Sequence, residues 1–268
     1  MGYRTGKIGY PGDILQSRAV IKKNLYALIP PEGLVRNRIP GFENCEITIL
    51  ASPKLGASFV DYLVTMLPGG RNAGGFGGEG IETFVFVLSG AVRAGDGTKD
   101  YDLGTNGFLF VPAGRRLFLE NAASGNSELF LYKRRFRPLP DGKMPATVCG
   151  NTDRIASYDY EGMKDVQLTD LLPVDDPSFD MNFHILSFEP GASHGYVETH
   201  VQEHGALILE GEGMYNLDNE WIPVRKGDYI FMASYCLQAG YGVGREGPFR
   251  YLYSKDCNRD EDCPSSKG

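Results

Sequence analysis

The sequence contains an internal repeat: the second half follows the first at a constant offset of 121 residues. Glycines that close an apolar run correspond at this offset, and so do the residues that follow two other runs. The matching residues are Gly90 and Gly211, Pro112 and Ala233, and the Leu-Tyr pairs at 131–132 and 252–253. Such a register is hard to produce by chance in turn-rich sequence, so we interpret the chain as a duplicated domain.

Each half consists of short apolar runs of strand length, separated by turn signals such as Gly95-Asp96-Gly97 and Asp218-Asn219. Many short strands at regular spacing are typical of an all-β sandwich or barrel. Helical periodicity is weak, and residues 169–172 are the one stretch considered as a short helix. The clearest strand runs are residues 83–88, 108–111, 117–119, 128–132, 183–188, 206–209, 229–232 and 249–253.

The two halves meet in a stretch rich in Pro and Gly, Arg-Pro-Leu-Pro-Asp-Gly at residues 137–142. Such a stretch cannot continue a strand ladder. We therefore expect an N-terminal domain over residues 1–137 and a C-terminal domain over residues 138–268. Each falls within the roughly 100–200 residues of a typical domain.

Composition excludes several classes of partner. The formal net charge is −7 and no long basic run is present, which disfavours nucleic acid. No apolar stretch approaches the length of a membrane span, and the first residues lack the apolar segment of a secretory signal. The five cysteines form no CxxC pair, so we expect reduced thiols and a cytoplasmic location.

The C-terminal half resembles the cupin superfamily in its two motifs. The first has the form G-x5-H-x-H-x3-E-x6-G, and Glu198, His200 and His204 lie at its three ligand positions. The second has the form G-x5-P-x-G-x2-H; it begins at Gly227 and carries Gln238 at the final His position. The resemblance implies two tandem cupin barrels, in other words a bicupin with jelly-roll domains.

These four residues form a candidate metal site. In an extended strand alternate side chains share a face, so Glu198, His200 and His204 would point into one barrel. Barrel closure would bring Gln238 close to them from another strand. Two imidazoles, a carboxylate and an amide oxygen suit Mn²⁺ best, with Fe²⁺, Ni²⁺ and Zn²⁺ as competitors. The remaining histidines, at 184 in a strand and 194 in a loop, are given no role.

The N-terminal half lacks the same set. Subtracting the offset of 121 from the four ligand positions gives Gly77, Glu79, Thr83 and Leu117. One carboxylate without an imidazole cannot hold a divalent transition metal. We therefore expect one metal ion per chain and an N-terminal barrel that is structural, mediates oligomerisation or lends a residue to the other site.

Longer strings make the resemblance more specific, and the chain closely resembles the ureidoglycine aminohydrolase family, bicupins of allantoin catabolism. The strings extend over nearly the whole chain and are far more specific than the general cupin motifs. They are residues 41–45 (GFENC), 53–62 (PKLGASFVDY), 75–84 (GFGGEGIETF), 194–204 (HGYVETHVQEH), 217–228 (LDNEWIPVRKGD) and 253–259 (YSKDCNR).

This resemblance implies a function. One Mn²⁺ would be held in the C-terminal barrel by the Glu-His-His-Gln set already described. The enzyme would replace the amino group of (S)-2-ureidoglycine by hydroxyl, releasing ammonia and (S)-ureidoglycolate. Tyr215, Tyr251 and Lys255 would bind the substrate, and Glu198, Tyr251 and Lys255 would serve catalysis, with Glu198 as the candidate general base. A homo-oligomer in the cytoplasm is expected, with no membrane or nucleic-acid partner.

Two alternatives stay open. The first is another metal-dependent cupin enzyme, such as a dioxygenase or a sugar-acid isomerase. Sites of that type usually carry three histidines, whereas this one has two and a neutral Gln. The second is a non-enzymatic ligand-binding bicupin, in which the ligand positions of both barrels would be expected to be lost.

Overall fold

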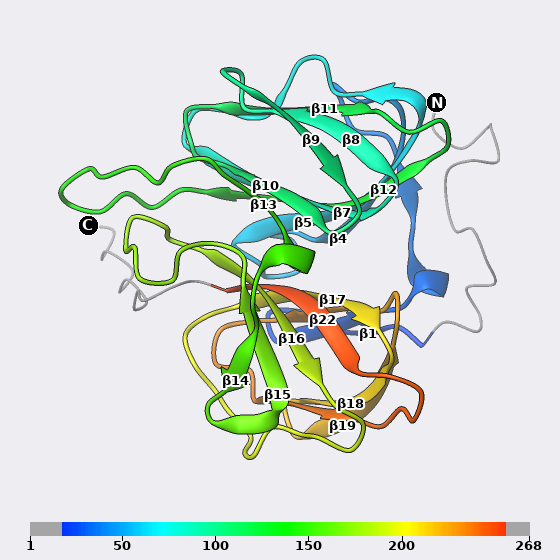
Figure 1. Ribbon diagram of the computed structural model, residues 1–268. Helices are drawn as coiled ribbons and strands as arrows, with labels where there is room; N and C mark the ends of the chain where they lie inside the picture. The colour runs from blue at the N-terminus through cyan, green and yellow to red at the C-terminus, as the bar shows by residue number, and fades with distance from the viewer. Residues whose placement is uncertain (1–17, 256–268) are drawn as a thin grey trace.

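The computed structural model describes residues 18–255, which fold into two β-barrels stacked one above the other (Figure 1). In these residues the only helices are two short 3₁₀ turns, η2 (Pro31–Gly33) and η3 (Thr152–Arg154). None is long and apolar enough to cross a membrane. The all-β prediction is confirmed. The expected short helix at residues 169–172 is wrong, because Thr169 and Asp170 end a strand that pairs with its neighbour. Cys257, Cys263 and residues 256–259 of the last string lie outside the described residues.

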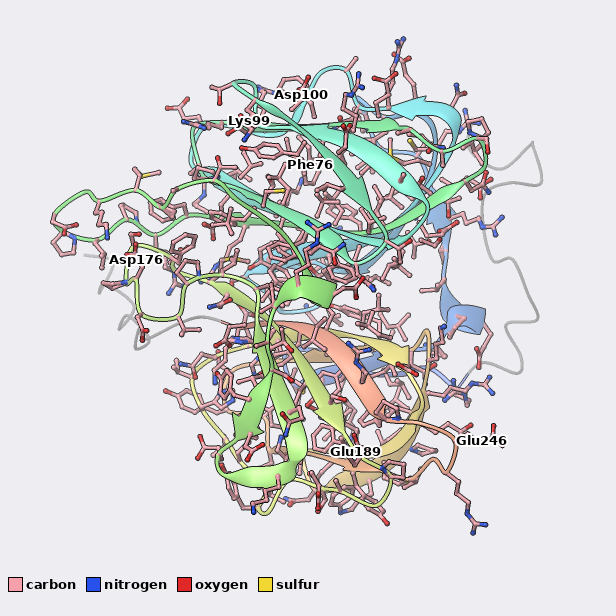
Figure 2. All side chains as sticks on the ribbon, in the orientation of Figure 1. Phe76, Lys99, Asp100, Asp176, Glu189 and Glu246 are labelled. Atoms are coloured by element: carbon pink, nitrogen blue, oxygen red, sulfur yellow. The ribbon has the colours of Figure 1, made fainter. Side chains whose placement is uncertain are left out.

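The upper barrel is built mainly from the N-terminal half and forms one sheet of 11 strands. Its strands are β3 (Arg36–Asn37), β4 (Glu43–Ala51), β5 (Phe59–Arg71), β6 (Phe76–Gly77), β7 (Ile81–Ser89), β8 (Ala91–Gly95), β9 (Asp100–Gly104), β10 (Gly107–Val111), β11 (Arg116–Asn121), β12 (Ser127–Arg135) and β13 (Val148–Asn151). Apolar side chains fill its interior, among them Phe76, which Figure 2 shows within the upper barrel.

The lower barrel consists of a sheet of eight strands and a sheet of three, from the C-terminal half and the start of the chain. The larger sheet contains β1 (Val20–Lys22), β2 (Tyr26–Ile29), β14 (Tyr158–Tyr160), β15 (Met163–Asp170), β16 (Asn182–Phe188), β17 (His204–Glu210), β20 (Tyr229–Met232) and β22 (Phe249–Lys255). The smaller sheet contains β18 (Glu212–Leu217), β19 (Glu220–Arg225) and β21 (Gln238–Gly242). Asp218 and Asn219 turn β18 into β19 with φ angles of 53° and 66°, as a tight hairpin requires.

The two halves exchange a strand. β2 precedes the upper barrel in sequence but pairs with β20 of the lower one, which places the blue start of the chain in the lower barrel (Figure 1). β13 precedes the lower barrel but pairs with β10 of the upper one. The expected join at residues 137–142 separates the halves in sequence, whereas the sheets cross it in both directions. The domain limits 1–137 and 138–268 therefore remain a prediction.

The barrels pack through an apolar face to which both contribute. Along β7, Val85 and Val87 point into the upper barrel, whereas Phe84 and Phe86 point toward the lower one. The rings of Phe84 and Phe183 stack with their centroids 3.8 Å apart. Strands buried on both faces are continuously apolar, which explains why these runs stand out in the sequence. The opposite face of β16, which carries His184 and Leu186, points into the lower barrel.

Candidate metal centre in the lower barrel

The four predicted ligands come from three short segments that meet at one end of the lower barrel. His204 is the first residue of β17, and Gln238 is the first residue of β21. Glu198 lies in the loop before β17, where its N–H and C=O both bond to the backbone of Gln238 at 2.9 Å. This pair of hydrogen bonds fixes the loop beside β21.

The extended run expected over these residues is wrong. Residues 199–203 form neither a strand nor a helix, and His200 lies in this irregular stretch. The chain bends at Val201, and the His200 ring bonds to the carbonyl oxygen of Gln202 at 3.1 Å. The side chains are brought together by this bend and by the bridge between Glu198 and Gln238, not by strand alternation.

The two imidazoles point lone pairs at each other. Nδ1 of His204 lies 2.7 Å from the carbonyl oxygen of Ser254, and Nδ1 of His200 lies near that of Gln202. A carbonyl oxygen only accepts, so each Nδ1 carries the proton and each Nε2 has a free lone pair in the neutral ring. The two Nε2 atoms are 3.3 Å apart. Lone pairs that converge in this way suit a cation, so the donor set fits a metal ion.

The other two residues complete the set less directly. Nε2 of Gln238 lies 2.8 Å from Nε2 of His200, and half a turn of the amide would place its oxygen there instead. The Glu198 carboxylate accepts a hydrogen bond from the Tyr160 hydroxyl at 3.4 Å. Within residues 18–255, no three His, Cys, Asp or Glu side chains lie close enough together to hold a metal ion. A bound ion would therefore require the Glu198 side chain to turn toward the histidines.

The electrostatics of the site favour neutral histidines. Burial, followed by the nearby Lys255 charge, lowers the pKa of His200 to about 4. Burial also holds the pKa of His204 well below its ordinary value. Burial raises the pKa of Glu198, against the opposing effect of Lys255. Neutral imidazoles are the form that binds metal, and a carboxylate with a raised pKa is a better proton acceptor.

The predicted substrate residues lie around the same small cavity. Tyr215 comes from β18, and Tyr251 and Lys255 come from β22. Tyr215 and Tyr251 are both 2% exposed, and the hydroxyl of Tyr215 donates to that of Tyr251 at 3.4 Å. The hydroxyl hydrogen of Tyr251 thus stays available to a bound molecule. The structure brings all seven predicted residues to one cavity.

The sequence analysis missed four residues that line this cavity, namely Tyr160, Leu186, Met232 and Tyr253. Tyr253 could have been found, because it alternates with Tyr251 and Lys255 along β22 and so shares their face. No local signal marked Tyr160, which reaches the site from β14 at the sheet edge.

In the upper barrel, closely packed residues occupy the positions that correspond to the predicted ligands. Leu117 is fully buried, and Thr83 is 1% exposed. A Cβ atom added to Gly77 would lie 2.7 Å from Cγ2 of Thr83, so a side chain there would clash. The positions that match Glu198 and His204 therefore leave no space for an ion between them.

Comparison with known proteins agrees with this geometry. Residues 184–252 match the family model described as "Cupin domain". The chain is 58% identical over 260 residues to a protein of Escherichia coli (strain K12) named (S)-ureidoglycine aminohydrolase, a match that covers 97% of this chain and 99% of the relative. The chain belongs to the (S)-ureidoglycine aminohydrolase family.

Two further matches support this assignment to the (S)-ureidoglycine aminohydrolase family. A protein of Oryza sativa subsp. japonica named as a probable member is 33% identical, over 91% of this chain and 76% of the relative. The crystal structure titled as protein Ylba from E. coli superposes with a TM-score of 0.83 at 55% identity, covering 95% of this chain and all of that one. The likeness thus extends over both barrels and confirms the predicted cupin fold.

Proposed function

We propose that the chain hydrolyses (S)-2-ureidoglycine, replacing its amino group by hydroxyl and releasing ammonia and (S)-ureidoglycolate in allantoin degradation. The observation that carries the proposal is the 58% identity to the E. coli enzyme over nearly the full length of both chains. The cavity supports it, because the imidazoles, the carboxylate, two tyrosines and the lysine that this chemistry needs converge there.

We further propose that the site takes one Mn²⁺, held by His200, His204, Gln238 and Glu198. The donor set has nitrogen and oxygen atoms and no sulfur, which suits a moderately hard ion. A bound ion would supply a positive centre that attracts the carboxylate and the amino group of the substrate. The upper barrel would hold none, since its equivalent positions are packed.

The other residues of the cavity bind the substrate and transfer the proton. Lys255 neutralises the carboxylate, and the hydroxyl of Tyr251, oriented by Tyr215, donates to the ureido group. The Glu198 carboxylate takes a proton from the attacking water and passes it to the departing amino group, which leaves as ammonia. The Tyr160 hydroxyl reaches the same carboxylate by its hydrogen bond. Burial of these groups excludes bulk water, which strengthens every charge interaction in the cavity.

The proposal also places the protein in the cytoplasm as a homo-oligomer with a small-molecule substrate and no nucleic-acid or membrane partner. The three cysteines within residues 18–255 are free thiols, in line with a reducing compartment. Size-exclusion chromatography with light scattering measures the oligomeric state directly.

Ammonia release from freshly prepared ureidoglycine tests the activity. Metal-free protein should be inactive, and added Mn²⁺ should restore turnover more strongly than Zn²⁺ or Ni²⁺. A protein that releases no ammonia with any divalent ion would overturn the proposed function. Oxygen consumption with candidate substrates would then point to the dioxygenase alternative.

A further inference from the structure

A pair formed by a buried histidine and a half-buried carboxylate lies in the wall of the lower barrel, outside the predicted site. Asp170 on β15 and His184 on β16 are cross-strand partners, and Nδ1 of His184 lies 2.6 Å from Oδ1 of Asp170. The hydroxyl of Tyr158 donates to the other carboxylate oxygen at 2.9 Å. Both oxygens of Asp170 are therefore engaged, and the imidazole is held in one orientation.

The pair faces the cavity side of the sheet. Leu186, two residues after His184 on the same face of β16, lines the cavity. The His184 ring stacks on Tyr253 with centroids 5.1 Å apart, and Tyr253 in turn meets the edge of the His204 ring at 5.3 Å. The Tyr253 ring thus contacts both His184 and His204, a predicted metal ligand.

One nitrogen of His184 is left without a partner. With Nδ1 donating to the Asp170 carboxylate, Nε2 carries a lone pair in the neutral ring. This atom is buried and accepts no hydrogen bond from any residue that the structure describes. Buried polar atoms are nearly always satisfied, so this open acceptor indicates a donor that reaches it in another state of the site.

Lys255 is the cation within reach of this pair. It lies two residues beyond Tyr253 on the same face of β22, diagonally across from His184. Burial acts to raise the pKa of Asp170, but hydrogen bonds from His184 and Tyr158 together with the Lys255 charge lower it below its ordinary value. The same lysine charge, after burial, helps to lower the pKa of His184. The lysine therefore lies in the electrostatic field of the pair.

We propose that the Asp170–His184 pair is a positioning device for Lys255. The Asp170 carboxylate supplies the negative charge, and His184 transmits it by donating from Nδ1. Its Nε2, which the Lys255 ammonium does not bond in this structure, becomes the acceptor for that ammonium when substrate is bound. Lys255 is thereby directed at the carboxylate of the bound substrate. His184 and Asp170 do not touch the substrate in this scheme and act only through the lysine.

Kinetics of a double-mutant cycle test the proposal, which rests on the proposed function. His184→Phe keeps the ring that stacks on Tyr253 and removes both nitrogens, and it should lower kcat/KM about tenfold, mainly through a raised KM. Lys255→Met should cost at least as much, and the double variant should be no worse than Lys255→Met alone. If the double variant lost the product of the two single losses in kcat/KM, the proposal would be overturned. Such a result would mean that His184→Phe causes a general structural defect, independent of the lysine.

Asp170→Asn isolates the charge, since the amide keeps the shape and can still accept from His184. It should lower kcat/KM about fivefold or more. Asp159→Asn is the matched control: Asp159 lies on the neighbouring strand β14, accepts a hydrogen bond from Gln167 and lines no part of the cavity. Its kinetics should equal those of the wild type, and bound metal should be unchanged in all five variants.

A second readout does not depend on activity. Reductive methylation with ¹³C-formaldehyde gives each lysine a methyl signal, and the signal missing from Lys255→Met protein identifies Lys255. This signal should shift in His184→Phe and Asp170→Asn and stay in place in Asp159→Asn. An unmoved signal in both pair variants would overturn the proposal, even if the wild type proved active. A shifted signal in a protein that is inactive on ureidoglycine would support the pair and refute the proposed substrate.

Discussion

Nε2 of His200 and Nε2 of His204 lie 3.3 Å apart, and the proton of each ring is held on the opposite nitrogen by a backbone carbonyl. The carbonyls belong to Gln202 and Ser254, so the orientation of both rings is set by the main chain rather than by an acidic side chain. Side-chain substitutions around the site therefore leave this arrangement in place. Two lone pairs held in this way repel each other until a cation comes between them.

We expect purified protein to bind one transition-metal ion per chain. The lower barrel offers converging imidazoles, whereas Gly77 and Thr83 of the upper barrel are packed against each other. His200→Ala combined with His204→Ala should abolish binding, as measured by elemental analysis after dialysis against chelator-free buffer. Glu79→Gln, which alters the one carboxylate among the upper positions, should leave the metal content unchanged. Two ions per chain would contradict the prediction that the upper barrel binds no metal.

Lys255→Met should lower kcat/KM about ten- to a hundredfold. A hydrogen bond to a charged group contributes about 1.5–3 kcal/mol, and each 1.4 kcal/mol is a factor of ten in rate. Metal content and melting temperature should stay close to those of the wild type, because Lys255 is the last residue of β22 and only partly buried. Near-normal kinetics would show that Lys255 does not contact the substrate carboxylate.

Asp61→Asn should stabilise the protein increasingly as pH rises. Asp61 is fully buried between the barrels, where Tyr229 donates to its Oδ2 at 2.6 Å. Burial raises the pKa of Asp61 well above its ordinary value, against the effect of that hydrogen bond. The folded state thus binds the proton more tightly than the unfolded state, whose aspartate has a pKa of about 3.9. The stabilisation from Asp61 is therefore complete at pH values below the unfolded pKa. It is lost as the pH rises through the folded pKa.

The asparagine variant does not titrate, so its free energy of unfolding lacks this loss. Between pH 4 and pH 8 its free energy of unfolding, relative to that of the wild type, should rise by about 1.4 kcal/mol for each unit by which the pKa of Asp61 is raised in that interval. Calorimetric melting temperatures at the two pH values measure the difference. Asp61→Ala serves as the comparison, since it leaves Tyr229 without its acceptor and should destabilise at both. A constant difference across pH would show that Asp61 is ionised in the folded protein.

Local patterns made much of the fold predictable. All eight apolar runs singled out in the sequence lie in strands, because alternation and turn residues act within a few positions of the chain. The exchange of β2 and β13 was not predicted, since strand pairing over such separations leaves no local mark. The exchanged strands do follow the repeat: Tyr26 and Val148, the first residues of β2 and β13, are 122 residues apart, close to the repeat offset of 121.

The site was predictable to the extent that it rests on motif spacing. The spacing placed Glu198, His200, His204 and Gln238 around one cavity, although the reason given for the first three, an extended strand, was wrong. The loop conformation depends on backbone bonds to Gln238, forty residues away, which spacing cannot reveal. His184 was placed correctly in a strand, but its bond to Asp170 depends on the register of β15 against β16.

Gln238→Leu should weaken Mn²⁺ binding if the Gln238 amide is a ligand. Gln238 is 3% exposed and lies 2.8 Å from Nε2 of His200, so its side chain already occupies the position from which its oxygen would coordinate. Leucine fills a similar volume, removes the oxygen and places an apolar group beside the ion. Gln238→His is the matched variant: imidazole is a softer donor, so metal should still bind, with preference moving toward Fe²⁺, Ni²⁺ or Zn²⁺ and aminohydrolase activity falling. Competition titrations with a fluorescent chelator measure both. If the leucine variant binds Mn²⁺ as tightly as the wild type, the amide only packs beside a three-ligand site and water takes the fourth position.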